Sequence, residues 1–228
     1  MNANKAQFIK FIFEENILKF GDFELKSGRH SPYFFNFGSF DDSVKLSRLG
    51  ESYASNIIEN DIKFDVIFGP AYKGIPISLS ASMALFYKHG LRVNYAFNRK
   101  EAKNHGEGGN IIGTSLKGKK ILAVDDVITS GRTIKETKEI IEKEGGELSA
   151  FLVALDREEK ALDSQLSALE EASKTYGVEI YAVAKISDVM NYMEKEYGKT
   201  YIHLSAIQEY LKLYGSESLG GLLKHNIY

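Results

Sequence analysis

The chain has 228 residues, of which 43% are hydrophobic and 26% charged, the composition of one globular domain or of one domain with an appendage. Its 29 basic and 31 acidic side chains leave a net charge of −2, which argues against a general nucleic-acid-binding protein. Because the chain contains no cysteine, disulfides, thiolate zinc sites and cysteine nucleophiles are excluded.

The apolar runs are short, such as 121–124 and 151–155, far below the roughly 20 residues that a membrane-spanning helix needs. The first seven residues are polar and do not open a signal peptide. We therefore expect a soluble protein without a membrane partner. A reducing, cytoplasmic location fits the lack of cysteine.

The first 40 residues predict a small lobe that contains a hairpin. Apolar side chains recur near helical spacing from Phe8 to Leu18, which predicts a helix over residues 3–19. A short strand and a turn are expected over 23–29, and a second strand over 33–36.

From residue 64 onward, apolar strand patterns alternate with helical ones. Residues 65–69 form a short apolar run that ends in Gly and Pro, as is typical of a buried strand. Further strands are expected at 91–97, 120–124, 147–155 and 178–183, helices at 74–89, 132–144, 162–176, 185–195 and 199–213, and a polar, glycine-rich loop at 99–113. This alternation predicts right-handed βαβ units and a largely parallel sheet, hence an α/β fold.

No Pro- or Ser-rich linker divides the chain, so we expect a single domain over 1–228. Its parts are a hood mainly from about 1–40, a core over about 60–190, and C-terminal helices over about 185–228.

The most informative segment is ILAVDDVITSGRT, residues 121–133. A buried strand carries Asp125 and Asp126 to its carboxyl end, where ligands bind in open α/β sheets. A helix then begins near Arg132, and its N-terminus offers free N–H groups and a positive dipole end to a phosphate. Small and hydroxylated residues fill the turn between them, namely Val127, Ile128, Thr129, Ser130, Gly131 and Thr133.

The two carboxylates suit hydroxyl groups or a cation beside the phosphate, so a sugar phosphate with free ribose hydroxyls meets both demands. A plainer alternative is an acidic strand end followed by an ordinary N-capped helix.

Two other phosphate-binding motifs do not match the sequence. Ile111 stands at the third glycine of a G-x-G-x-x-G pattern, and Lys120 replaces the Ser/Thr of a near P-loop that also precedes a strand instead of following one.

Residues 124–131, VDDVITSG, resemble the 5-phosphoribosyl 1-pyrophosphate (PRPP) motif of type I phosphoribosyltransferases. Further segments narrow the resemblance to the bacterial orotate phosphoribosyltransferases: FELKSGR at 23–29 with YFFN at 33–36, NRKEAKNHGEGG at 98–109, and ALDR at 154–157. The resemblance implies a type I phosphoribosyltransferase fold, a largely parallel sheet flanked by helices with a small N-terminal hood. It also implies transfer of ribose 5-phosphate from PRPP to N1 of orotate, in pyrimidine (UMP) biosynthesis.

The resemblance assigns roles residue by residue. It implies that PRPP is bound by Lys26, Tyr72, Lys73, Arg99, Lys100, Lys103, His105, Asp125, Asp126, Val127, Ile128, Thr129, Ser130, Gly131, Arg132 and Thr133. Orotate is expected to contact Lys26, Phe34, Phe35, Thr129 and Arg157, and the catalytic residues are expected to be Lys103, Asp125, Asp126 and Lys73. Mg²⁺ is implied as a cofactor that PRPP and water hold, with no protein metal site. Residues 99–109 are implied to cover the active site of the other subunit of a homodimer.

This chain departs from the family pattern at two positions. Arg132 stands where a small residue or Thr is usual, and Asn104 where Asp is common. The backbone amides that hold the 5′-phosphate survive the first change. A hydroxyl contact is lost there, or a charge-assisted bond from Arg132 is gained.

From the residues alone, plainer explanations stay open. Lys26 fits a solvated turn, and residues 72–74 fit a surface turn after a strand. Phe34 and Phe35 point to opposite faces of a strand, so one or both fit the core. Residues 99–109, with four potential cations in seven residues, also fit a solvated loop.

Arg157 fits either a guanidinium that binds a carboxylate bidentately or a surface arginine paired with Glu158 or Glu159.

Two other functions of the protein also stay open. One is a purine or uracil phosphoribosyltransferase, against which Lys26, the two phenylalanines and Arg157 argue. The other is a regulator that senses PRPP without turnover, against which residues 99–109 argue, because a sensor has no reactive cation to shield from water.

Overall fold

The computed structural model describes residues 2–25, 27–103, 109–128, 131–162 and 164–220. Its centre is a six-stranded sheet in the order β5-β4-β3-β6-β7-β8. The strands are β3 (Val66–Gly69), β4 (Asn94–Lys103), β5 (Gly109–Gly113), β6 (Lys120–Val127), β7 (Glu147–Asp156) and β8 (Glu179–Lys185). All neighbours are parallel except β4 and β5. The predicted α/β fold with a largely parallel sheet is confirmed.

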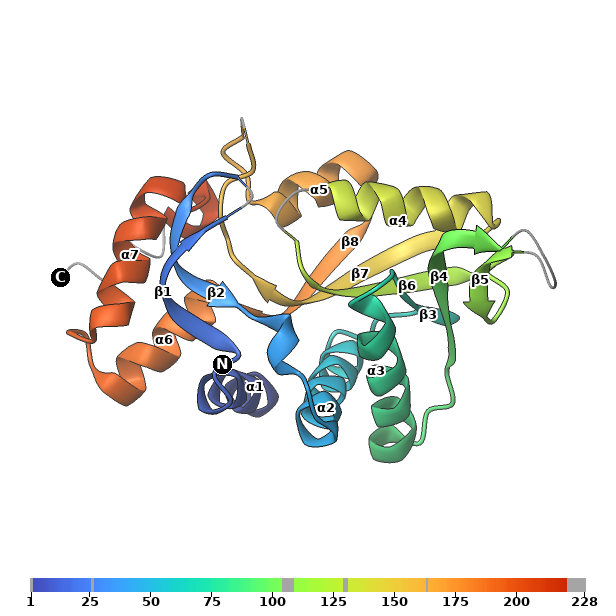
Figure 1. Cartoon of the computed structure of the whole chain (residues 1–228), viewed down its shortest axis with the longest axis horizontal. Coiled ribbons are helices and arrows are strands. Elements are labelled where there is room, and N and C mark those ends of the chain that lie inside the picture. Colours follow the sequence, from blue (N-terminus) through green and yellow to red (C-terminus); the bar gives the residue numbers. More distant parts are fainter. Residues whose placement is uncertain (1, 26, 104–108, 129–130, 163, 221–228) are drawn as a thin grey trace.

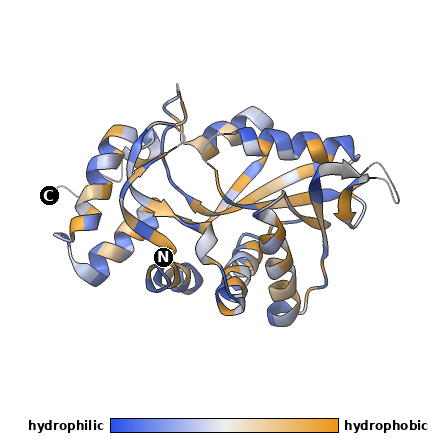
Figure 2. Ribbon diagram, in the orientation of Figure 1, coloured by the Kyte–Doolittle hydropathy of each residue, from blue (hydrophilic) through white to orange (hydrophobic). Residues whose placement is uncertain are grey.

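Helices cover both faces of this sheet (Figure 1). One face carries α1 (Ala3–Glu14), α2 (Ser43–Glu59) and α3 (Gly74–His89), and the other carries α4 (Arg132–Lys143) and α5 (Ala168–Tyr176). Side chains alternate along β6, so Leu122 and Val124 join one core while Ile121 and Ala123 join the other. Figure 2 shows the result as apolar strands inside and polar outer helix faces, most clearly on α4.

A separate antiparallel hairpin, β1 (Leu18–Glu24) and β2 (His30–Phe35), stands at one end of the molecule (Figure 1). It packs against α7 (Ile202–Tyr214), which follows α6 (Ile186–Tyr197). Within the predicted hood over about 1–40, the hairpin thus packs against α7, whereas α1 packs against α2 and β8. A single 3₁₀ turn, η1 (Phe37–Ser39), connects the hairpin to α2.

Several sequence predictions differ from the structure. The helix predicted over 3–19 ends at Glu14, because Asn16 takes a left-handed backbone conformation (φ 51°) and the chain then enters β1. The loop predicted over 99–113 is wrong at both ends, since β4 continues to Lys103 and pairs with β5. No element was assigned to 43–59, where α2 buries one apolar face.

The helix predicted over 162–176 begins later than expected, at Ala168. Ser167 and Glu170 form a capping box there, so side chains satisfy the first free N–H groups. Among the described residues, no helix combines the length and the apolarity that crossing a bilayer requires.

Candidate active site

The loop after β3 packs very closely against the end of β6. A Cβ atom on Gly69 would lie 2.1 Å from the carbonyl oxygen of Gly74, and one on Gly74 would lie 2.7 Å from that of Val124. Only glycine fits such contacts. The start of α3 is therefore held against the carboxyl end of β6.

This close packing places Lys73 beside Asp126. The Nζ atom of Lys73 donates a hydrogen bond to Oδ2 of Asp126 at 2.6 Å, and Asp126 is only 4% exposed. The same Nζ lies 5.8 Å from the ring centroid of Phe37, in the turn that follows the hairpin. Three segments that are remote in sequence thus meet at one edge of the sheet.

Asp125 lies beside this pair, and its carboxyl group has a raised pKa. Burial, and next the neighbouring charge of Asp126, raise the pKa of Asp125 to about 7. Its Oδ1 accepts a hydrogen bond from the backbone N–H of Asp126 at 3.0 Å, and its carbonyl oxygen accepts one from the buried Tyr53 hydroxyl at 2.7 Å. The site therefore holds a carboxyl group that changes charge near neutral pH.

Strand β4 supplies the next wall of the site. The side-chain Oδ1 of buried Asn98 accepts a hydrogen bond from the backbone N–H of Ala71 at 2.9 Å, which ties the β3 loop to β4. Lys100 extends from the same strand and places Nζ 4.6 Å from the ring centroid of exposed Tyr72. Arg99 lies between them in the sequence, so its side chain points to the opposite face of the strand, and Lys100 is the cation that β4 places beside Tyr72.

The N-terminus of α4 follows directly on this strand end. Gly131 precedes its first residue, and no side chain of the described residues caps the helix, as is also the case for α3 and α7. Val127 and Thr133 are half-buried and Ile128 is buried, on either side of this turn. The order of strand, turn and helix is the one that the sequence predicts, and the role of this helix start in binding an anion stays a prediction.

Arg132, the first residue of α4, points along the helix surface. Its Nε donates to Oε1 of Glu136 at 2.7 Å, one turn later, and its side chain is 83% exposed. Of the two outcomes expected at this position, the geometry favours the lost hydroxyl contact, because the guanidinium pairs with Glu136 on the solvent-exposed face.

The hood residues behave differently from one another. Phe35 is 4% exposed and packs in the core, whereas Phe34 is 40% exposed, so the predicted alternation is confirmed.

Arg157 follows β7 and is 6% exposed, with Nε 2.9 Å from Oε1 of Glu159. The ion pair that the sequence allowed between these two residues is present, but it is buried and not at the surface.

Several predicted site residues lie outside the described part of the chain, namely Lys26, His105, Thr129 and Ser130, as does Asn104. For Lys103 the structure describes the backbone, as the last residue of β4. Among the described residues, no group of three or more His, Asp or Glu side chains is placed to hold a metal ion.

Comparison with known proteins agrees with this geometry. A family model of the phosphoribosyl transferase domain matches residues 38–176, more than half of the chain. The curated orotate phosphoribosyltransferase of Vibrio parahaemolyticus is 48% identical over 215 residues, covering 94% of this chain and 100% of its own length. The chain belongs to the orotate phosphoribosyltransferase family.

Solved structures point to the same family. The orotate phosphoribosyltransferase of Francisella tularensis superposes with a TM-score of 0.82 at 37% identity, over 92% of this chain and 100% of that one. The curated orotate phosphoribosyltransferase of Aeromonas salmonicida is 47% identical over 218 residues, 94% of this chain and all of its own. The type I phosphoribosyltransferase fold is thereby confirmed.

Two residues hold parts of this candidate site in place but were not among the residues expected from the sequence to bind a substrate. Tyr53 shares helical spacing with Leu49 and Ile57, which signals burial but not its bond to Asp125. Asn98 lies inside a family motif, but only the fold shows that its amide holds the β3 loop.

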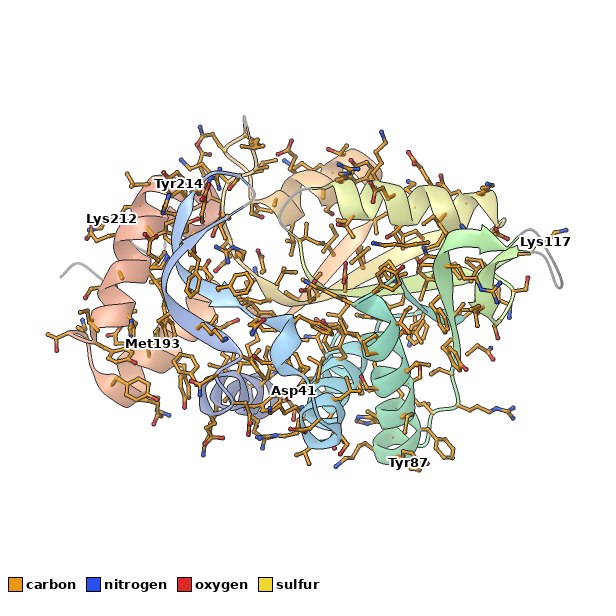
Figure 3. All side chains as sticks on the ribbon, in the orientation of Figure 1. Asp41, Tyr87, Lys117, Met193, Lys212 and Tyr214 are labelled. Atoms are coloured by element: carbon orange, nitrogen blue, oxygen red, sulfur yellow. The ribbon has the colours of Figure 1, made fainter. Side chains whose placement is uncertain are left out.

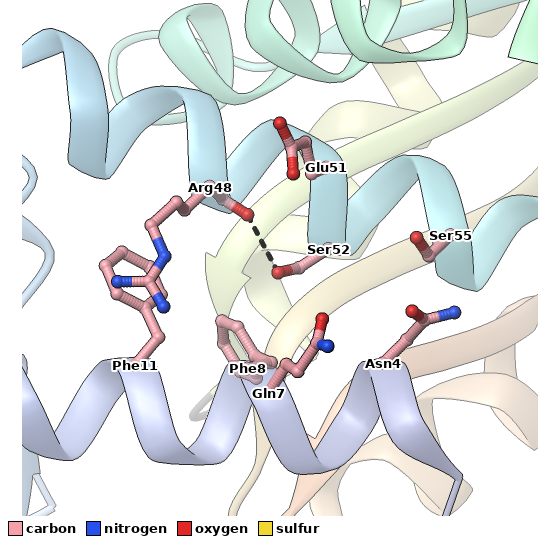
Figure 4. A pocket seen from close by; sticks show the side chains of 8 residues that line it. All are labelled: Asn4, Gln7, Phe8, Phe11, Arg48, Glu51, Ser52 and Ser55. Atoms are coloured by element: carbon pink, nitrogen blue, oxygen red, sulfur yellow. Dashed lines mark hydrogen bonds between the residues drawn. The ribbon is translucent and has the colours of Figure 1, made fainter. Parts of the chain in front are cut away.

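A groove between α1 and α2 lies apart from the strand ends that form this site (Figure 4). Phe8 and Phe11 form its floor, and Arg48 stacks over Phe11 with Cζ 4.2 Å from the ring centroid. Its other lining residues are polar: Asn4, Gln7, Glu51, Ser52 and Ser55. None of the residues expected to bind a substrate lines it.

Proposed function

We propose that this chain transfers ribose 5-phosphate from PRPP to N1 of orotate, releasing pyrophosphate and orotidine 5′-monophosphate, a step of pyrimidine nucleotide synthesis. The observation that carries the proposal is the contact of Lys73 with Asp126 beside the uncapped start of α4. A cation, two carboxyl groups and a helix start at one edge of the sheet support the proposal, because a ribose carrying a 5-phosphate and a pyrophosphate requires such groups.

In this proposal the acidic pair serves the ribose. Asp125 and Asp126 accept hydrogen bonds from its hydroxyls and favour the positive charge that develops at the anomeric carbon as the bond to pyrophosphate breaks. The 5′-phosphate is bound by the first N–H groups of α4, with hydroxyl groups from Thr129, Ser130 and Thr133. The reaction inverts the anomeric carbon and needs no covalent nucleophile.

The leaving pyrophosphate gathers charge, and the cationic residues offset it. Lys73 and Lys100 are placed among the described residues, with Tyr72 beside Lys100, and the proposal adds Arg99, Lys103 and His105 to this set of cations. Mg²⁺ suits this step because pyrophosphate and ribose oxygens are the hard ligands that it prefers. When bound through PRPP and water, it supplies further neutralisation of the leaving group.

Orotate is held, in the same proposal, by Lys26, Phe34, Phe35, Thr129 and Arg157. The exposed ring of Phe34 offers a flat apolar face to the base, whereas Phe35 acts through its backbone because its side chain belongs to the core. Arg157 supplies the cation for the carboxylate, the group that distinguishes orotate from uracil and the purines.

We also infer a homodimer. Met83, Phe86, Tyr87, Leu91 and Tyr95 are exposed apolar side chains at the end of α3 and the start of β4. Tyr87 stands at the outer tip of α3 (Figure 3). An apolar patch of this kind is typical of a protein interface. In this proposal, residues 99–109 of each copy serve the active site of the other.

The decisive experiment follows the loss of orotate absorbance with PRPP and Mg²⁺ present. The proposal predicts turnover that needs all three, and no comparable turnover when uracil, adenine or hypoxanthine replaces orotate. PRPP binding without turnover would indicate the regulator instead. Preference for another base would indicate a different phosphoribosyltransferase.

A further inference from the structure

The guanidinium of Arg157 is the centre of a buried hydrogen-bond network. Its Nε and Nη2 atoms donate to Oε1 of Glu159 at 2.9 and 2.5 Å, and Nη2 also donates to Oγ of Ser31 at 3.0 Å. The guanidinium carbon lies 4.3 Å from the ring centroid of Tyr33. A guanidinium has five N–H donors, and these bonds use three of them. The remaining two are both on Nη1.

Glu159 is itself held by several elements. Its Oε1 accepts a third hydrogen bond, from the Tyr33 hydroxyl at 3.1 Å, and its Oε2 lies 3.6 Å from Nη1 of Arg29. Arg29 is fixed in turn by a hydrogen bond to the carbonyl oxygen of Lys160 at 3.0 Å and by the ring of Tyr214, 4.9 Å away. Glu159 is therefore anchored by the hairpin and, through Arg29, by α7. A carboxylate held in this way is not a loosely placed counter-ion.

The charges of this network do not cancel. Two guanidinium groups, those of Arg157 and Arg29, share the single carboxylate of Glu159. Burial raises the pKa of Tyr33 well above its ordinary value, so its hydroxyl is a neutral donor. Arg157 and Glu159 are buried, whereas Arg29 is half-buried and shares its charge with water. An anion beside Nη1 of Arg157 therefore gains from the surplus positive charge in a largely desolvated place. A carboxylate on the ligand is such an anion.

We propose that Glu159 is a positioning residue, which orients Arg157 so that Nη1 faces the carboxylate of orotate and thereby sets the preference for a base that carries a carboxylate. The inference rests on the proposed role of Arg157 in binding orotate. It also revises the expected geometry, because the Nε edge of the guanidinium is occupied by Glu159 and the contact with orotate is made by one amino group.

The alternative role of Glu159, as a stand-in for the ligand carboxylate, predicts the opposite change in the KM for orotate. If Glu159 only occupied the place of the ligand carboxylate, removing its charge would free Arg157 and lower the KM for orotate. If Glu159 positions Arg157, removing its charge disorders the guanidinium and raises that KM. The sign of the change therefore separates the two.

The first test is Glu159→Gln, which keeps the shape of the side chain and removes its charge. We expect the KM for orotate to rise about tenfold, as for other partners of a buried charge at a binding site, with the KM for PRPP little changed. The matched control is Glu158→Gln. Glu158 is adjacent and equally buried, but its Oε2 accepts from the backbone N–H of Ser187, and we expect no change in the KM for orotate. A lower KM in Glu159→Gln, or equal effects in both variants, overturns the proposal.

A double-mutant cycle with Arg157→Ala shows whether Glu159 acts through Arg157. In the Arg157→Ala background, Glu159→Gln should have no further effect on the KM for orotate. If Arg157→Ala itself leaves that KM unchanged, the proposed carboxylate contact fails. If Arg157→Ala raises it and Glu159→Gln does not, only the positioning role fails.

Tyr33→Phe keeps the test decisive if Arg157→Ala does not fold. This variant keeps the ring beneath the guanidinium and removes only the hydroxyl that holds Glu159. We expect a smaller rise in the KM for orotate than in Glu159→Gln, with thermal melting confirming the fold. Unchanged KM values for orotate in both folded variants overturn the proposal.

Discussion

The ammonium group of Lys73 contacts the carboxylate of Asp126 directly, at 2.6 Å, across the end of the sheet. The cation assigned to the pyrophosphate and an acid assigned to the ribose therefore hold each other in position. In the proposed function, PRPP has to share or replace this contact when it binds.

The first prediction follows from that contact. Lys73→Gln should lower kcat/KM for PRPP by roughly 10²-fold, since it removes a charge that stabilises the leaving group. The loss in Lys73→Gln combined with Asp126→Asn should be smaller than the sum of the single losses in free energy, because the two side chains touch. Steady-state kinetics of the two single variants and the double variant measure this. Strict additivity would mean that the two residues act independently.

The second prediction concerns Asp125 and pH. Its pKa is about 7 in the folded protein and 3.8 when unperturbed, so between these values the folded state binds a proton that the unfolded state has released. The free energy of unfolding therefore falls as the pH rises from about 4 to 7. Asp125→Asn should remove this loss and raise stability at pH 8 relative to pH 4 by on the order of 1–4 kcal/mol.

Urea unfolding at both pH values measures the effect of Asp125→Asn. The control is Asp61→Asn, because the Asp61 side chain is 79% exposed and the change there should not alter the pH dependence of stability. An equal stability difference at pH 4 and pH 8 for Asp125→Asn would contradict the shifted pKa.

The third prediction concerns Arg132. Because its side chain pairs with Glu136 on the solvent-exposed face of α4, Arg132→Thr should change the free energy of unfolding by no more than about 0.5 kcal/mol. PRPP affinity should change by less than tenfold, or about 1.4 kcal/mol. Calorimetric titration with PRPP measures the affinity, and Glu136→Gln serves as the control that breaks the same pair. Complete loss of PRPP binding would show that Arg132 has replaced the backbone amides as the phosphate ligand.

The fourth prediction tests the proposed dimer. Lys103→Ala should lower kcat far more than it weakens PRPP binding, because its contact matters most as charge develops on pyrophosphate. If Lys103 serves the neighbouring subunit, a heterodimer with Asp125→Asn/Asp126→Asn has one site with both defects and one intact site. Mixing the two nearly inactive homodimers should then restore up to about a quarter of wild-type activity after random exchange. No recovery despite demonstrated exchange would place Lys103 in the site of its own chain.

The sequence by itself determined the elements whose signals are local. The helix predicted over 74–89 has those bounds in the structure, because its apolar pattern is bounded by Pro70 before it and by Gly90 after it, which caps it in a left-handed conformation (φ 67°). The strand that ends in Asp125 and Asp126 and the helix start after Gly131 were likewise visible, because a buried strand, a turn and a helix start each have their own composition.

Only the tertiary structure decided which of these residues meet. Ser31 and Arg157 are 126 positions apart, and their hydrogen bond exists because the hairpin packs beside the end of β7. Strand β4 continues past residue 97 because β5, which follows the loop, pairs with it. Periodicity records whether a side chain is buried but not its partner. The sequence allowed Arg157 to pair with Glu159, two residues away, but only the fold shows that the pair is buried, because the hairpin with Ser31 and Tyr33 packs against it.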